Sequence, residues 1–162
     1  MSSDSRPVVV AYDGSAEARA AIREAATLFP ARRLVVASVW EPGLAMAMAM
    51  APAIDPTGIG YVAPAGETIA EIDRAQRDHA AEMAEAGVGI ARELGASAEA
   101  YPVPDERDVA VTVADLADEL DACTIVVGSR GLGAVKSKLL GSTSAGLLQR
   151  AGRPVLVVRT DR

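Results

Sequence analysis

The chain is poor in the residues on which many catalytic and metal-binding motifs depend. Of its 162 residues, one is cysteine (Cys123), one is histidine (His79), and only 3% are aromatic. A single cysteine excludes a disulfide within the chain, and the two residues together are too few for a zinc site of Cys and His ligands. A Ser-His-Asp triad would have to use His79. The shortage of aromatic rings leaves no platform on which nucleic-acid bases could stack.

Long apolar runs are also missing. The longest mostly apolar run, residues 44–54, is far shorter than the roughly 20 residues that a membrane helix needs. The first seven residues are polar and lead into only five apolar residues, 8–12, which is not the pattern of a signal peptide or an anchor. We therefore expect a cytoplasmic protein without a membrane partner, and its single thiol suits a reducing compartment.

Positive charge is scarce except in one part of the chain. The formal net charge is −6, but residues 128–162 hold seven Lys or Arg and one acid, whereas residues 1–127 hold nine bases and 21 acids. The overall negative charge argues against a nucleic-acid partner. The local excess of cations instead predicts a site for a small anion in the last quarter of the chain.

Apolar runs alternate with helical patterns along the whole sequence. Strands are expected at 8–12, 34–40, 98–103, 124–128 and 154–159, and helices at 16–29, 67–94, 109–120 and 142–152. This alternation predicts an α/β fold, a doubly wound five-stranded parallel sheet of order 3-2-1-4-5 with helices on both faces. Pro102 favours an edge position for the third strand. Ligands of such sheets bind where the winding direction reverses, at the carboxyl ends of the strands.

The chain has 162 residues, and half of them are hydrophobic, which is enough for one compact core. We therefore expect residues 1–162 to form a single domain. Residues 41–66, rich in Ala, Met, Pro and Gly, are expected to be a variable and mobile connection within it. The alternating methionines there are more typical of adaptable apolar packing than of a copper(I) site.

Glycines gather in the loop after the fourth expected strand, where residues 128–142 read GSRGLGAVKSKLLGS. Glycine lets backbone N–H groups approach an anion, and a helix starting near Ser142 adds unpaired N–H groups and a partial positive charge. Neither G-x-G-x-x-G nor G-x-x-x-x-G-K-[ST] fits this loop. What remains is the spacing of Gly128, Gly131, Gly141 and Ser142. Glycines after a strand are often only turn residues, so the composition by itself leaves both readings open.

The spacing resembles the G-x2-G-x9-G-[ST] motif that ATP-binding members of the universal stress protein family carry between strand four and helix four. The segment VAYDGS near the start and RPVLVV near the end are also similar to that family, and the resemblance covers the chain except residues 41–66. It implies an ATP-binding stress-response or signalling protein in which nucleotide occupancy acts as a switch. It further implies a homodimer formed through the last strand, 154–159.

The resemblance also implies which residues surround the nucleotide. Backbone groups near the ribose and phosphates would be those of Gly128, Arg130, Gly131 and Gly133. The phosphate tail would be held by Gly141, Ser142, Thr143 and Ser144. Asp13 would lie against the nucleoside with the backbone of Ala11 nearby, and the backbone of Val39 would read the adenine edge.

Several alternatives stay open at this level. Asp13 could instead be only the N-cap of the first helix, and Lys136 and Lys138 could be solvated loop charges. ADP, AMP or cyclic AMP could replace ATP, and Mg²⁺ could accompany the phosphates. A slow nucleotide hydrolase would use the same pocket, but Asp13 is the one evident carboxylate near it, so binding is favoured over catalysis. No catalytic residue and no protein metal ligand is predicted.

Overall fold

A computed structural model of the chain describes residues 6–43, 68–105, 107–130 and 140–160. Its elements form a five-stranded parallel sheet of order β3-β2-β1-β4-β5, which confirms the predicted fold class and strand order. In chain order the elements are β1 (Val8–Ala11), α1 (Ala16–Leu28), β2 (Leu34–Trp40), α3 (Ile69–Glu93), β3 (Ala98–Pro104), α4 (Val109–Glu119), β4 (Thr124–Gly128), α5 (Ser142–Arg150) and β5 (Val155–Val158).

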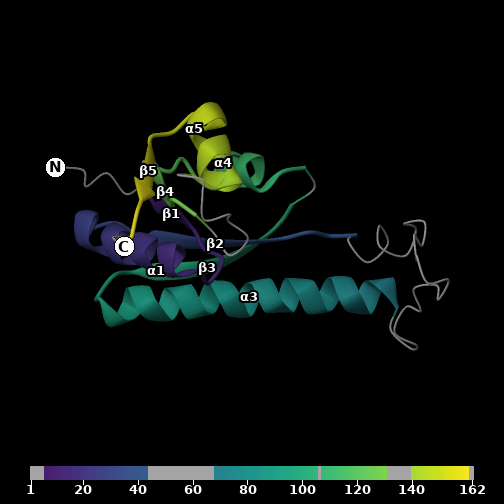
Figure 1. Cartoon of the computed structure of the whole chain (residues 1–162). Coiled ribbons are helices and arrows are strands. Elements are labelled where there is room, and N and C mark those ends of the chain that lie inside the picture. Colours follow the sequence, from purple (N-terminus) through teal and green to yellow (C-terminus); the bar gives the residue numbers. More distant parts are fainter. Residues whose placement is uncertain (1–5, 44–67, 106, 131–139, 161–162) are drawn as a thin grey trace.

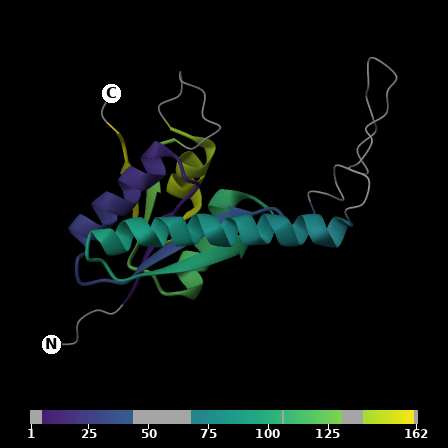
Figure 2. The same ribbon diagram turned by 90° about the horizontal axis from the view of Figure 1, so that it is seen from below.

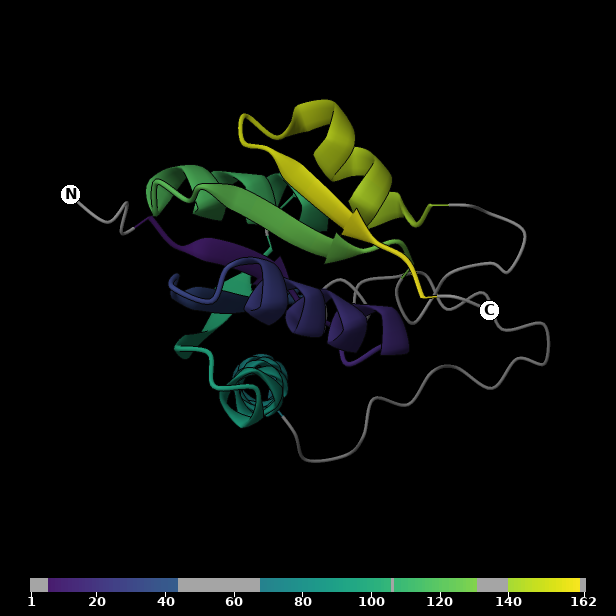
Figure 3. The ribbon, with the colours of Figure 1, turned by 90° about the vertical axis from the view of Figure 1, so that its left-hand side faces the viewer.

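Helices cover both faces of the sheet. In Figures 1 and 3, α1 and α3 lie on one face, and α4 and α5 lie on the other. Figure 2 shows α3 running along its face beside α1. Each helix connects two parallel strands, so the chain must cross a face of the sheet to begin the next strand. The helix thereby covers apolar side chains that would otherwise be exposed.

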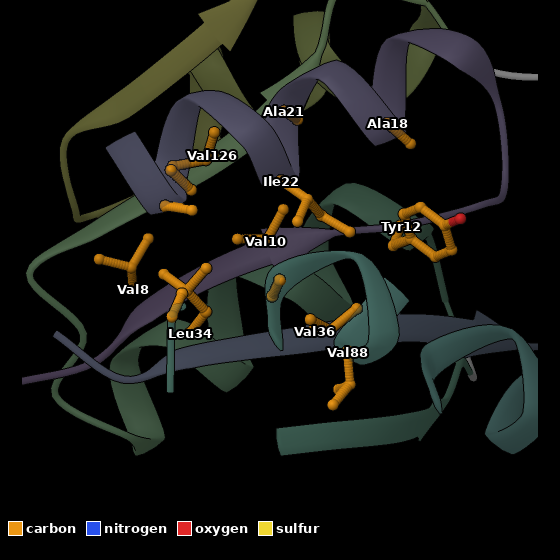
Figure 4. Close-up of a cluster of buried hydrophobic side chains, with 14 of the residues drawn as sticks. Val8, Val10, Tyr12, Ala18, Ala21, Ile22, Leu34, Val36, Val88 and Val126 are labelled. Carbon is orange, nitrogen blue, oxygen red and sulfur yellow. The ribbon is translucent and has the colours of Figure 1, made fainter. Parts of the chain in front are cut away.

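Successive residues of the strands point to opposite faces of the sheet and so pack into two separate apolar cores, as the two-residue period of a strand requires. Val8 and Val10 point toward α1 and α3, where they pack with Ile22 and Val88 (Figure 4). The intervening Val9 belongs to the core under α4 and α5. All of these side chains have no accessible surface. The strands therefore read as continuous apolar runs because both faces of the sheet are buried.

Three of the four described helices begin with a side-chain cap. Ser15 caps α1, Thr68 and Glu71 form a capping box at α3, and Asp108 caps α4. The fourth helix, α5, has Gly141 at its N-cap and no side-chain cap hydrogen bond. The first amides of α5 thus depend on another partner, since no intrahelical carbonyl can reach them.

The predicted boundaries are accurate to about two residues. β2 and β4 have the predicted limits, and β3 lies at the sheet edge, as Pro102 indicated. The predicted connection at 41–66 falls almost entirely outside the described residues. Among the described residues, no helix is both long enough and apolar enough to cross a membrane.

Candidate functional site

A cavity of about 730 Å³ opens at the carboxyl ends of the strands. Its walls include the ends of β1, β2 and β4 and the start of α5. β1 pairs with β2 on one side and with β4 on the other, so this is the point at which the winding direction of the sheet reverses. Open α/β sheets bind their ligands at such a point.

Every predicted site residue that the structure describes lines this cavity. These residues are Ala11, Asp13, Val39, Gly128, Arg130, Gly141, Ser142, Thr143 and Ser144. Gly131 and Gly133 lie outside the described residues, as do Lys136 and Lys138. Positions separated by more than 120 residues of sequence are therefore brought to one cavity.

Asp13 holds the turn between β1 and α1. Its Oδ1 accepts a hydrogen bond of 3.0 Å from the backbone N–H of Ser15, and Gly14 has a φ of +78°, a backbone conformation that favours glycine. The N-cap of α1 is Ser15, whose Oγ accepts from the N–H of Ala18 at 3.1 Å. The alternative that Asp13 is the N-cap is therefore wrong, and its carboxylate lines the cavity from the turn.

Gly128 allows α1 to approach the end of β4. A Cβ atom at this position would lie 2.8 Å from both the carbonyl carbon and the Cβ of Glu17, closer than real Cβ contacts allow. Two residues later, Nη2 of Arg130 lies 3.3 Å from Oε1 of Glu17. The first turn of α1 thus fixes both the strand end and an arginine at the cavity wall.

The N-terminus of α5 is tied to the end of β4. The Gly141 N–H donates to the Ser129 carbonyl at 2.7 Å, and Ser144 Oγ, which is buried, lies 3.1 Å from the same carbonyl. The Ser144 hydroxyl therefore has a structural partner already. Gly141 itself is extended, with φ −74° and ψ 168°, so other residues can adopt its conformation.

One wall of the cavity was not predicted. It consists of side chains from the middle of α3, whose amino-terminal end projects past the strand ends in Figure 1. These side chains are Gln76, His79, Ala80 and Met83. His79 is exposed, but it also lines the cavity. The spacing of three and four residues places these positions on one helix face. That regularity was visible in the sequence, but it gave no indication that this face meets the end of β2.

Two of the C-terminal cations, Arg150 and Arg153, form ion pairs away from the cavity. Arg153 contacts Asp118 and Asp121, both at 2.6 Å, and the hydrogen bonds from Asp118 and then Asp121 raise the pKa of Arg153. Arg150 lies 3.6 Å from Asp108. The local excess of cations is thus divided between ion pairs and the cavity, and Arg130 is the cation that the described part of the chain places at the cavity.

Carboxylates at the cavity are few. Asp13 and Glu41 line it, and Glu17 reaches its edge through Arg130. Within residues 6–43, 68–105, 107–130 and 140–160, no three His, Cys, Asp or Glu side chains gather in a way that could hold a metal ion.

The family profile described as "Universal stress protein family" matches residues 5–159. The chain belongs to this family. A universal stress protein of Mycolicibacterium smegmatis is 31% identical over 157 residues, covering 95% of this chain and 48% of that protein. Another, from Thermus aquaticus, is 32% identical over 156 residues and covers 95% of this chain and 98% of its own length. The chain therefore spans about half the length of the first of these relatives and nearly all of the second.

Solved structures of the universal stress protein family share the fold. One from Archaeoglobus fulgidus, in complex with dAMP, has a TM-score of 0.61 and 24% identity, covering 94% of this chain and 97% of its own. A universal stress protein in complex with cAMP has a TM-score of 0.64, 24% identity, and coverage of 96% and 98%. A family protein from Arabidopsis thaliana with AMP bound has a TM-score of 0.60, 16% identity, and coverage of 96% and 92%.

Proposed function

We propose that this chain binds an adenine nucleotide, with ATP as the expected ligand, in the cavity at the carboxyl ends of β1, β2 and β4. The observation that carries the proposal is the start of α5. This helix begins at the cavity wall, and it is the one described helix whose N-cap offers no side-chain acceptor. Its free N–H groups and the positive end of its dipole suit a phosphate.

The rest of the cavity supports a nucleotide whose phosphates point toward α5. Its volume of about 730 Å³ lies within the roughly 300–1,000 Å³ of small-molecule sites. Ala11, Val39 and Met83 supply apolar lining suited to a base, and the carboxylate of Asp13 supplies acceptors for ribose hydroxyls. Related structures that hold dAMP, cAMP and AMP support an adenine nucleotide in general, and the preference for ATP is our proposal.

Binding without rapid hydrolysis is the activity that we propose. Cleavage of a phosphoanhydride needs an oriented water and usually a metal held by carboxylates. Asp13 and Glu41 are the carboxylates among the described lining residues. Mg²⁺ that arrives on the phosphates would keep most of its water ligands. We therefore propose a cytoplasmic switch whose output depends on occupancy.

A homodimer formed through β5 completes the proposal. β5 lies at the sheet edge and pairs only with β4 in the described chain, and Val155, Leu156 and Val157 are half-buried. An apolar edge strand invites pairing with a second copy. Because α5 packs against β5, a phosphate that stabilises the start of α5 would also influence this edge. Light scattering after size-exclusion chromatography should give twice the chain mass of 16.7 kDa, and a monomer at all concentrations would contradict the dimer.

Calorimetric titration of the purified protein with ATP, ADP, AMP and cyclic AMP tests the binding proposal. We expect ATP to bind, and we expect Gly141→Val to weaken it strongly, because a branched side chain would stand at the start of α5. Circular dichroism should show an unchanged fold, since Val can adopt the extended conformation of Gly141. Absence of heat from all four nucleotides at millimolar concentration would overturn the proposal.

A further inference from the structure

Arg130 and Glu17 form an ion pair at the edge of the proposed phosphate site. Nη2 of Arg130 lies 3.3 Å from Oε1 of Glu17, and the two side chains are only 25% and 18% exposed. Arg130 lines the cavity. Arg130, the cation that the described residues place at the cavity, thus already has an anionic partner within the protein.

The backbone keeps this pair together. Glu17 lies in the first turn of α1, which is fixed by the Ser15 cap. Arg130 follows β4 by two residues, and the backbone of Glu17 occupies the space where a side chain on Gly128 would be. The backbone of Glu17 therefore cannot move away from the strand end without displacing α1, which keeps the carboxylate within one side-chain length of Arg130.

We propose that Glu17 is a built-in competitor for Arg130 that lowers the affinity for nucleotides in proportion to the negative charge that they carry. This inference rests on the proposed function, since it requires phosphates near Arg130. Glu17 is a regulating residue, not a ligand: it acts on the nucleotide through Arg130 and through its own charge.

Two effects act in the same direction. A phosphate that binds Arg130 must share the guanidinium with the Glu17 carboxylate or displace that carboxylate. The charge-assisted hydrogen bond between Arg130 and Glu17 is then weakened or lost, which reduces the net gain from binding. Whether or not the pair opens, the carboxylate also repels the incoming phosphates across a half-buried site, where screening by water is incomplete. Both effects grow with the number of phosphate charges, so Glu17 narrows the difference in affinity between ATP and AMP.

The Glu17→Gln variant separates this role from simple support of Arg130. Gln keeps the length and an oxygen acceptor for the guanidinium but removes the charge. We expect about three- to tenfold tighter binding of ATP, a smaller gain for AMP and cyclic AMP, and a gain for ATP that shrinks as the KCl concentration rises. In an Arg130→Gln background, Glu17→Gln should give a smaller gain, because the component that acts through Arg130 is gone.

Glu99→Gln is the matched control. Glu99 pairs with Arg33 at 2.9 Å, near the amino ends of β2 and β3 and away from the cavity, so this variant should bind ATP like the unmodified protein. Weaker ATP binding by Glu17→Gln, or a gain that is equal for ATP and AMP, would overturn the inference. Unchanged binding by Glu17→Gln would overturn it too. Absence of nucleotide binding in both the unmodified protein and Glu99→Gln would instead overturn the proposed function.

Discussion

Replacing Gly141 by Asp should make the protein more stable and at the same time weaken nucleotide binding. Gly141 is the N-cap of α5, is already extended, and supplies no acceptor to the first amides of the helix. An Asp at this position would accept from the N–H of Thr143 or Ser144, the second and third residues of α5. It would thereby occupy the groups that we assign to the phosphates.

The two expected effects have opposite signs and can be estimated. For folding, the added cap hydrogen bond contributes a few tenths of a kcal/mol relative to Gly, and a carboxylate at the positive end of a helix contributes about 0.3–1 kcal/mol. For a chain of this size, a total of about 0.5–1.3 kcal/mol raises Tm by about 1–5 °C. For binding, the loss of one or two charge-assisted hydrogen bonds, at about 1.5–3 kcal/mol each, lowers the affinity for ATP by a factor of at least about ten.

The assay pairs thermal unfolding without ligand with calorimetric titration of ATP. Gly141→Asn is the matched variant, because it offers the same cap without the charge and should fall between the unmodified protein and Gly141→Asp in affinity. ATP binding by Gly141→Asp that equals that of the unmodified protein would refute the placement of phosphate at α5. A variant that is both unstable and unable to bind would refute the reasoning about the cap.

Two further predictions concern the scaffold. Gly128→Ala should lower the free energy of unfolding by about 1–3 kcal/mol in urea titrations, because its Cβ would meet the backbone of Glu17 at 2.8 Å. Gly89→Ala in α3, where a Cβ meets nothing within 4 Å, is the control and should be stabilising. Hydrogen bonds from the backbone and then the side chain of Thr68 lower the pKa of Glu71 from 4.5, so the Glu71 carboxylate stabilises the fold above pH 4.5. The stability difference between the unmodified protein and Glu71→Gln should vanish as the pH falls through the lowered pKa, and a difference that persists in acid would contradict the role of the capping box.

The sheet could be predicted from the sequence because its signals are local. Runs such as residues 34–40 and 124–128 are apolar throughout, as strands buried on both faces must be, and the helices between them fix parallel pairing. The spacing of Gly128, Gly141 and Ser142 indicated the position of the cavity as well, since Gly128 ends β4 and the other two begin α5 at the same edge of the sheet.

Other features depend on contacts between distant segments and left no local signal. Nothing in the sequence around Gly128 indicates that the backbone of Glu17 fills the space beside it. The helical period of α3 showed that Gln76 and Met83 share a face, but not that this face closes the cavity. The cap of α1 is Ser15, two residues beyond Asp13, and propensities alone do not resolve a difference of two residues in where a helix begins.

The most direct test of the central claim is an NMR titration of the isotope-labelled protein with ATP, following the backbone amides. If the phosphates lie on the start of α5, the largest shifts should be at Ser142, Thr143 and Ser144, with smaller ones at Asp13, in the turn after β1, and at Gly128, at the end of β4. Shifts confined to the amino ends of the strands, or no shifts at millimolar ATP, would contradict the account.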